Sequence, residues 1–143
     1  MELPIRRFDT ELPLPEYKTP GAAAMDCAVR DDVTIAPKSI GYAHLNFALK
    51  PPAGHFVAMA ARSSLHKRGL LMANGIAIFD EDYCGDEDEY RVIFYNFTDE
   101  PVEIKRGDRV TQIIVMPYNK VTWNEVETLG NPSRGGIGST GVS

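Results

Sequence analysis

An aspartate at the end of an apolar run stands out among the residues that could do chemistry. Asn74-Gly75 is a tight-turn pair, and the apolar run that follows it ends at Asp80. This order predicts a turn and then a strand with the Asp80 carboxylate at its end. Residues 80–89 hold seven acidic side chains, and we expect most of them to form a solvated hairpin tip. Asp80 differs from the others because it directly ends the apolar run.

Arg62, Ser63 and Ser64 form a second group, at the end of a predicted strand that leads into a helical turn. The guanidinium offers a planar fork to phosphate oxygens, and the hydroxyls and free amides of the turn add donors. We expect the turn over residues 63–68 to be capped by Ser63 and ended by Gly69. A capped surface turn with a solvated arginine would account for the same residues.

Two more segments offer groups that could contact phosphate. A turn at residues 106–108 leads to Arg109 and, on the next strand, to Gln112, although a structural Asp–Arg pair would explain this segment as well. Residues 133–141 combine an arginine and hydroxyls with many glycine amides, which suits a polyphosphate once the segment is ordered. A flexible terminus would have the same composition.

Several common enzyme classes are excluded by missing motifs. The sequence has no GxxxxGK[ST] loop, no GxGxxG after a strand, no HExxH and no H-x-E…P-C-x-x-C pattern. The last of these absences removes the zinc-dependent nucleoside deaminases. Ser63 or Ser64 beside His66 does not indicate a catalytic triad, whose partners usually lie far apart in sequence.

Composition places the chain among ordinary globular proteins. It has 143 residues, 43% hydrophobic and 24% charged, which predicts a single domain. The net charge of −5 argues against nucleic acid or a membrane as a partner, but not against a small phosphate ligand. No apolar run approaches about 18 residues and no signal-peptide pattern is present, so we expect neither a membrane span nor a signal peptide. Two cysteines without a CxxC motif favour the cytoplasm.

Short apolar alternations separated by turn residues predict an all-β sandwich or barrel. One strand is expected over residues 42–49. One of its faces carries Ala43, Leu45, Phe47 and Leu49, and the other carries Tyr42, His44 and Asn46. Residues 110–116 form a largely buried strand in this prediction. We predict one β-domain over residues 1–130 and a mobile C-terminal arm over 131–143, because the arm has almost no apolar residues to anchor it.

In order, these segments resemble the five motifs of the trimeric dUTPase family, the deoxyuridine triphosphate nucleotidohydrolases. The resemblance runs from about Pro20 to Gly141. Its motifs are residues 21–26, 61–70 (ARSSLHKRGL), 74–85, 106–117 (RGDRVTQIIVMP) and 134–141. The second and fourth motifs are highly specific in combination.

The resemblance implies a distorted jelly-roll (β-clip) fold and a homotrimer with an active site at each subunit boundary. The arm of one subunit would close over the active site of a neighbour. The implied reaction is hydrolysis of dUTP to dUMP and pyrophosphate, which limits uracil incorporation into DNA and supplies dUMP for dTMP synthesis. Mg²⁺, held mainly by the triphosphate and water, is the implied cofactor, with no protein side chain as a metal ligand.

Residue roles carried over by position follow from the same resemblance. Asp80 would activate water for attack on the α-phosphorus, and Tyr83 would pack against deoxyribose and exclude a 2′-hydroxyl. Asn74 and the backbone near Ile78 would read uracil, and Asp26 with Arg109 would form a supporting ion pair. The implied contacts to the phosphates and the pocket are Arg62, Ser63, Ser64 and Gln112, with Arg134, Gly138, Ser139 and Thr140 gripping the γ-phosphate.

Ile137 departs from the family pattern, and two alternatives stay open. It stands where the fifth motif carries a Phe that stacks on uracil, so KM is expected to rise or closure to weaken. A dCTP deaminase or a bifunctional deaminase–dUTPase shares the fold, and Glu87 or Glu89 could serve as its base. A nucleotide-sensing, non-catalytic dUTPase-like trimer is the second alternative, supported only by Ile137.

Overall fold

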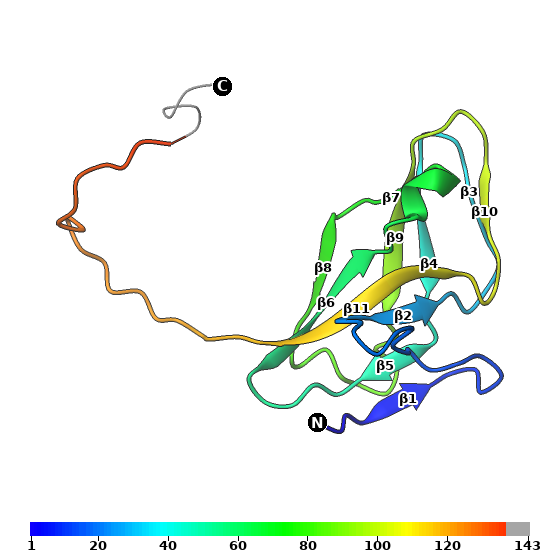
Figure 1. Cartoon of the computed structure of the whole chain (residues 1–143), viewed down its shortest axis with the longest axis horizontal. Coiled ribbons are helices and arrows are strands. Elements are labelled where there is room, and N and C mark those ends of the chain that lie inside the picture. Colours follow the sequence, from blue (N-terminus) through cyan, green and yellow to red (C-terminus); the bar gives the residue numbers. More distant parts are fainter. Residues whose placement is uncertain (137–143) are drawn as a thin grey trace.

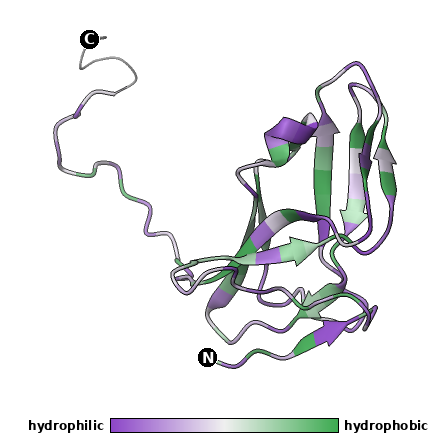
Figure 2. Ribbon diagram, turned by 45° about the vertical axis from the view of Figure 1, so that its right-hand side comes forward, coloured by the Kyte–Doolittle hydropathy of each residue, from purple (hydrophilic) through white to green (hydrophobic). Residues whose placement is uncertain are grey.

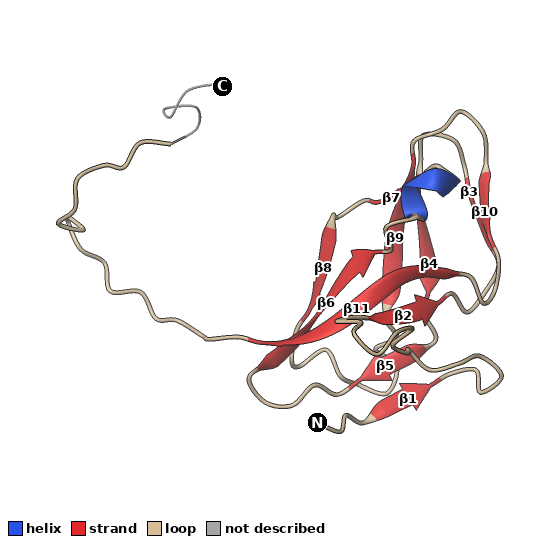
Figure 3. Ribbon diagram, in the orientation of Figure 1, coloured by secondary structure: helices blue, strands red, loops and turns tan. Residues whose placement is uncertain are grey.

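Eleven short strands and one helical turn form the described part of the chain, residues 1–136 of the computed structural model (Figure 3). The prediction of an all-β chain is confirmed. In chain order, the elements are β1 (Ile5–Arg7), β2 (Met25–Ala28), β3 (Val33–Ile35), β4 (Ile40–His44), β5 (Phe47–Leu49), β6 (His55–Ala61), η1 (Leu65–Arg68), β7 (Leu70–Met72), β8 (Ile76–Phe79), β9 (Arg91–Asn96), β10 (Val102–Ile104) and β11 (Arg109–Pro117).

Two antiparallel sheets form the body of the jelly-roll fold (Figure 1). The four-stranded sheet has the order β2-β11-β6-β8, and the three-stranded sheet has the order β4-β9-β7. The pairs β1-β5 and β3-β10 form two smaller ribbons. Within residues 1–136, β8 pairs only with β6 and is therefore an edge strand. This edge position leaves one side of the β8 backbone available to a ligand.

Alternating burial along the strands builds the core. In β9, Val92, Phe94 and Asn96 are buried, whereas Arg91 is exposed. Figure 2 shows that hydropathy changes along the strands, in bands of green and of paler or purple colour. The largest fully buried side chains include Tyr90 and Phe47, and burying a large apolar side chain contributes about 1.5–3 kcal/mol.

The single strand predicted over residues 42–49 is in fact two strands. β4 ends at His44 and β5 begins at Phe47, because Asn46 adopts a φ of 74°. Asn46 was predicted on the strand face opposite the apolar residues, and it is only 2% exposed. Its side chain accepts a hydrogen bond from the Asp9 N–H (2.7 Å) and donates one to the Asp9 carbonyl (2.9 Å). Asn46 therefore ends the strand and holds the N-terminal segment.

The helical turn forms near its predicted place, but Ser63 does not cap it. η1 is a 3₁₀ turn whose N-cap is Ser64, and that side chain makes no capping hydrogen bond. The turn ends at Gly69, as predicted, with a φ of 81°. A Cβ there would lie 2.4 Å from Cγ2 of Thr98, so this position requires glycine. Among residues 1–136, no helix is long and apolar enough to cross a membrane.

The chain beyond β11 leaves the β-domain. Residues 119–136 are exposed and form no helix or strand. Figure 1 shows them as an extended trace that runs away from the strands. The last strand thus ends at Pro117, well before residue 130.

Candidate active site

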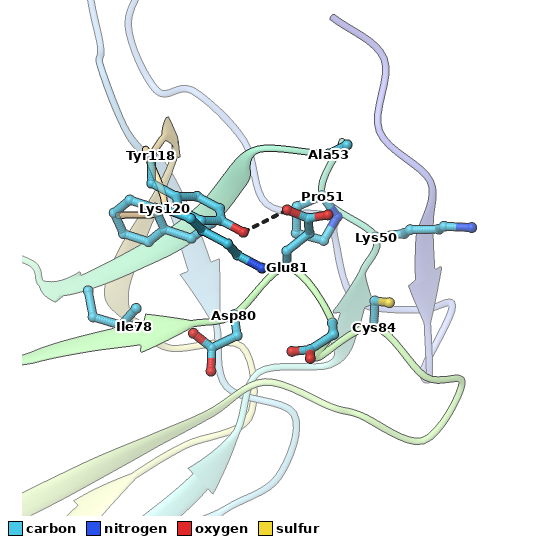
Figure 4. Close-up of a pocket in the computed structure, with 11 residues that line it drawn as sticks. Lys50, Pro51, Ala53, Ile78, Asp80, Glu81, Cys84, Tyr118 and Lys120 are labelled. Carbon is cyan, nitrogen blue, oxygen red and sulfur yellow. Dashed lines mark hydrogen bonds between the residues drawn. The ribbon is translucent and has the colours of Figure 1, made fainter. Parts of the chain in front are cut away.

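Asp80 lies directly after β8, as predicted, and lines a cavity of about 790 Å³. Ile78 from β8 and Lys50 and Lys120 from other segments line the same cavity. Asp80 is exposed, and Figure 4 shows its carboxylate turned away from the Glu81–Tyr118 bond. The carboxylate is therefore accessible to a ligand or to water.

Glu81, the next residue, has a different environment. Its Oε2 accepts a hydrogen bond from the Tyr118 hydroxyl at 2.8 Å (Figure 4). It also accepts one from the Gly54 N–H at 2.8 Å. The bond from Tyr118 is the largest of the causes that hold the pKa of Glu81 below its usual value. The Tyr118 ring also meets Phe56 edge-on, with centroids 6.2 Å apart. Glu81 thus links its own loop to the start of the C-terminal segment.

The predicted turn at Asn74-Gly75 is formed and starts the hairpin. Gly75 has a φ of 69°, and its N–H donates to the Met72 carbonyl at 3.1 Å. Along β8, Ala77 is buried and Ile78 is 55% exposed, so Ile78 faces outward. Asn74 is also exposed, at the opposite end of the strand from Asp80.

Tyr83 is half-buried against an aromatic cluster. Its ring centroid lies 5.8 Å from that of Phe79 and 5.9 Å from that of Tyr90. Its hydroxyl donates to the Glu89 carbonyl at 3.2 Å. The two neighbouring rings and the hydrogen bond of the hydroxyl thus hold the Tyr83 ring in place.

Asp26 joins two arginines beyond the far end of β6. Its Oδ2 lies 3.0 Å from Arg62 Nε and 3.1 Å from Arg109 Nη1, so Asp26 and Arg109 form the ion pair that the family resemblance implied. Arg62 Nη1 donates to the Arg109 carbonyl at 3.1 Å, and Gln112 Nε2 donates to the Ala61 carbonyl at 3.1 Å. A guanidinium carries five N–H donors, so Arg62 retains donors for a phosphate.

The Asp80 and Arg62 groups do not meet within one chain. Because Val57 pairs with Phe79, Asp80 lies beside the start of β6, whereas Arg62 follows its end. At about 3.3 Å per residue, the six-residue step from Phe56 to Arg62 covers about 20 Å. Arg62 lines a separate cavity of about 410 Å³, together with Ser63. The predicted site residues are therefore divided between the two ends of β6.

Two of the remaining predicted phosphate contacts, Ser64 and Arg134, are exposed. The contacts predicted at Ile137, Gly138, Ser139 and Thr140 lie outside the described residues. Within residues 1–136, no three His, Cys, Asp or Glu side chains gather into a possible metal site.

Glu89 is an exception to the solvated tip predicted over residues 80–89. It is 6% exposed, and its carboxylate lies 2.9 Å from Arg30 Nε and 2.8 Å from His44 Nδ1. The sequence suggested Glu89 only as a possible deaminase base and did not predict its burial or its ion pairs. Its position directly before the mostly apolar run over residues 90–95 was the available signal, whereas its partners are distant in sequence.

Comparison with known proteins relates the chain to one family. The dUTPase family model matches residues 10–141. A deoxyuridine 5′-triphosphate nucleotidohydrolase of Dictyoglomus turgidum is 37% identical over 145 residues, covering 96% of this chain and 97% of the relative. The crystal structure of dUTPase from Streptococcus mutans has 25% identity and a TM-score of 0.76, covering 83% of this chain and 98% of that chain. A G164S mutant of Staphylococcus bacteriophage 80alpha dUTPase with dUpNHpp is 17% identical, with a TM-score of 0.85 over 99% of both chains, which shows a common fold.

Proposed function

Because the chain belongs to the dUTPase family, we propose that it hydrolyses dUTP to dUMP and pyrophosphate. The observation that carries the proposal is the accessible carboxylate of Asp80 at the end of an edge strand and at the wall of a large cavity. The adjacent acid, Glu81, is already engaged by Tyr118 and Gly54.

Asp80 is the general base of the proposed reaction. It orients a water molecule and accepts its proton while the water oxygen attacks the α-phosphorus. The bond from the α-phosphorus to the bridging oxygen breaks, and the bridging oxygen leaves with pyrophosphate. A general base must lie within hydrogen-bond reach of the proton that it removes, and the exposure of Asp80 supports this role.

The edge of β8 is the proposed reader of uracil. Uracil presents one N–H donor between two carbonyl acceptors, a pattern that backbone groups near Ile78 can match and that cytosine reverses at its N3 and at its exocyclic amine. Asn74 lies at the start of the same hairpin and adds a polar side chain. Tyr83 forms the wall against deoxyribose and leaves no room for a 2′-hydroxyl.

Arg62, Ser63, Ser64 and Gln112 are the proposed phosphate and pocket contacts, and they act on the nucleotide bound by another copy of the chain. The phosphate groups of one triphosphate lie much closer together than the roughly 20 Å between Asp80 and Arg62 in one chain. A symmetric assembly can bring Arg62 of one copy to Asp80 of the next. This separation supports a homotrimer, in which Asp26 and Arg109 hold Arg62 in place.

The C-terminal arm completes the site in this proposal. Residues 131–143 form the arm that closes over a neighbouring subunit, and the segment after Pro117 connects this arm to the strands. Arg134, Gly138, Ser139 and Thr140 grip the γ-phosphate, and Ile137 covers the base. Mg²⁺ enters with the triphosphate, which together with water supplies its ligands, and it neutralises phosphate charge. We place the reaction in the cytoplasm, on a free nucleotide, without nucleic acid or a membrane as partner.

A deaminase is not favoured by the acidic residues that might have served as its base. The Glu89 carboxylate is buried between Arg30 and His44. Glu87 is 82% exposed in its side chain and pairs with Arg6 at 2.6 Å. The Dictyoglomus turgidum relative compared above is a deoxyuridine 5′-triphosphate nucleotidohydrolase.

Pyrophosphate release from dUTP, dCTP, dTTP and UTP tests the proposal. The wild-type protein with Mg²⁺ is expected to act on dUTP and to discriminate against the other three. Asp80→Asn is expected to lower kcat by about 10²–10⁴-fold because the general base is lost. Asp82→Asn is the matched control, since Asp82 is another exposed acid lining the same cavity, and it should keep most of the activity. Full activity in Asp80→Asn, or ammonia release from dCTP, would contradict the proposal.

A further inference from the structure

Glu89 is a buried carboxylate that the proposed reaction does not use. Its Oε1 accepts a hydrogen bond from the Asn46 N–H (3.0 Å), and its Oε2 accepts one from Arg30 Nη2 (3.0 Å). Arg30 Nε and His44 Nδ1 lie at ion-pair distance, 2.9 and 2.8 Å, without hydrogen-bond geometry. A buried carboxylate is costly unless it is paired and hydrogen-bonded. These contacts therefore fix Glu89 in one position.

The backbone of Glu89 is in turn tied to Tyr83. The Tyr83 hydroxyl donates to the Glu89 carbonyl at 3.2 Å. Tyr90, the residue after Glu89, stacks on Phe79 with centroids 3.9 Å apart and planes 8° apart, and both rings contact Tyr83. Glu89 and Tyr90 thus support Tyr83 at its tip and along its side.

Tyr83 also borders an open space into which it could move. A cavity of about 360 Å³ is lined by Tyr83, Glu89, Arg30, His44 and Phe8, among others. A ring that borders empty space keeps its position only if something holds it. The bond from the Tyr83 hydroxyl to the anchored Glu89 backbone provides that restraint.

We infer that Glu89 is a positioning residue that holds Tyr83 rigid and so sets the discrimination between deoxyribose and ribose. The inference rests on the proposed function, in which Tyr83 packs against the sugar of the nucleotide. The Tyr83 ring excludes the 2′-hydroxyl of ribose only if the ring cannot move back by about the width of an oxygen atom. Glu89 acts through Tyr83 and does not touch the nucleotide.

Steady-state kinetics on dUTP and UTP test this role. Glu89→Gln keeps the size of the side chain and an acceptor for Asn46 but removes the charge that faces Arg30 and His44. It is expected to raise the kcat/KM for UTP relative to dUTP by about tenfold, and to raise the KM for dUTP more than it lowers kcat. Should Glu89→Gln fail to fold, His44→Gln provides a milder change, since the His44 side chain is 42% exposed, with a smaller effect in the same direction.

Arg6→Gln is the matched control for the charge change. It breaks the exposed Arg6–Glu87 pair on the same acidic segment and should leave the ratio of UTP to dUTP at its wild-type value. An unchanged ratio in folded Glu89→Gln would overturn the inference. A proportional loss of activity on both nucleotides would overturn it too, because it would show only a general structural role.

A second readout separates this inference from the proposed function. A wild-type protein that releases no pyrophosphate from dUTP would contradict the proposed function. The position and motion of the Tyr83 ring can be followed independently, without nucleotide, by NMR of ring-¹³C-labelled tyrosine. Glu89→Gln is expected to shift and broaden the Tyr83 signals and to leave those of the exposed Tyr17 in place. Unmoved Tyr83 signals would overturn the inference whatever the activity.

Discussion

Acidic residues close together in this sequence have different roles because their contacts differ. Asp80 presents an exposed carboxylate to a cavity. Glu81 accepts two hydrogen bonds, and Glu89 is buried beside Arg30 and His44. The side-chain chemistry is the same in all three, so solvent access and the available donors decide which carboxylate can serve as a base.

The contact between Glu81 and Tyr118 predicts a pH-dependent stability. The pKa of Glu81 is lowered in the folded protein, so its contribution to stability is present above its ordinary pKa and is lost as the pH falls through the lowered value. Tyr118→Phe removes the largest cause of this shift and is expected to lower Tm near neutral pH. The difference in Tm from the wild type should shrink as the pH falls through the lowered pKa of Glu81, because the carboxyl is then protonated. Thermal unfolding of both proteins across this range checks it, and a constant difference at every pH would contradict the assignment.

At the scale of the elements, single residues with unusual backbone conformations set the strand boundaries. Asn46 separates β4 from β5 by its φ of 74° and binds both backbone groups of Asp9. It thereby connects the N-terminal segment to the edge of the three-stranded sheet. Because this strand boundary depends on the Asn46 side chain, substitution of Asn46 tests it.

Asn46→Ala is expected to destabilise the protein by about 2–4 kcal/mol. The substitution leaves partly buried backbone groups of Asp9 without partners and places a Cβ residue without a compensating side chain at positive φ. Asn46→Gly loses the same hydrogen bonds but relieves the backbone strain, so it should be the more stable variant of the two. Denaturant unfolding at equal protein concentration measures both. Equal stability of Asn46→Ala and the wild type would show that Asn46 does not fix this boundary.

The turn at Asn74-Gly75 and the strand break at Asn46 show what the sequence could and could not predict. Asn74-Gly75 was predictable because a residue pair typical of tight turns directly precedes an apolar run. The break at Asn46 was not, since apolar alternation continues through residues 43–49 and the partner, Asp9, lies 37 residues away. Glu81 was missed for the same reason, because Tyr118 is also 37 residues distant. Local patterns reveal turns and strands, whereas these contacts depend on the tertiary fold.

At the scale of the whole molecule, the site residues are divided along β6. The order of motifs indicated which residues take part, and the Asp26–Arg109 pair was predicted from it. The separation of Asp80 from Arg62 was not evident from spacing, because it depends on the pairing of β6 with β8. The proposed homotrimer would resolve the separation, since each site would then draw Asp80 and Arg62 from different copies.

Complementation between two inactive variants tests this shared site most directly. Asp80→Asn and Arg62→Gln are each expected to be nearly inactive alone. When equal amounts are refolded together, random trimers place an intact Asp80 opposite an intact Arg62 at about a quarter of the sites. A site shared between copies therefore predicts recovery of about a quarter of the wild-type rate of pyrophosphate release from dUTP. Activity no higher than that of the two variants measured separately would contradict it.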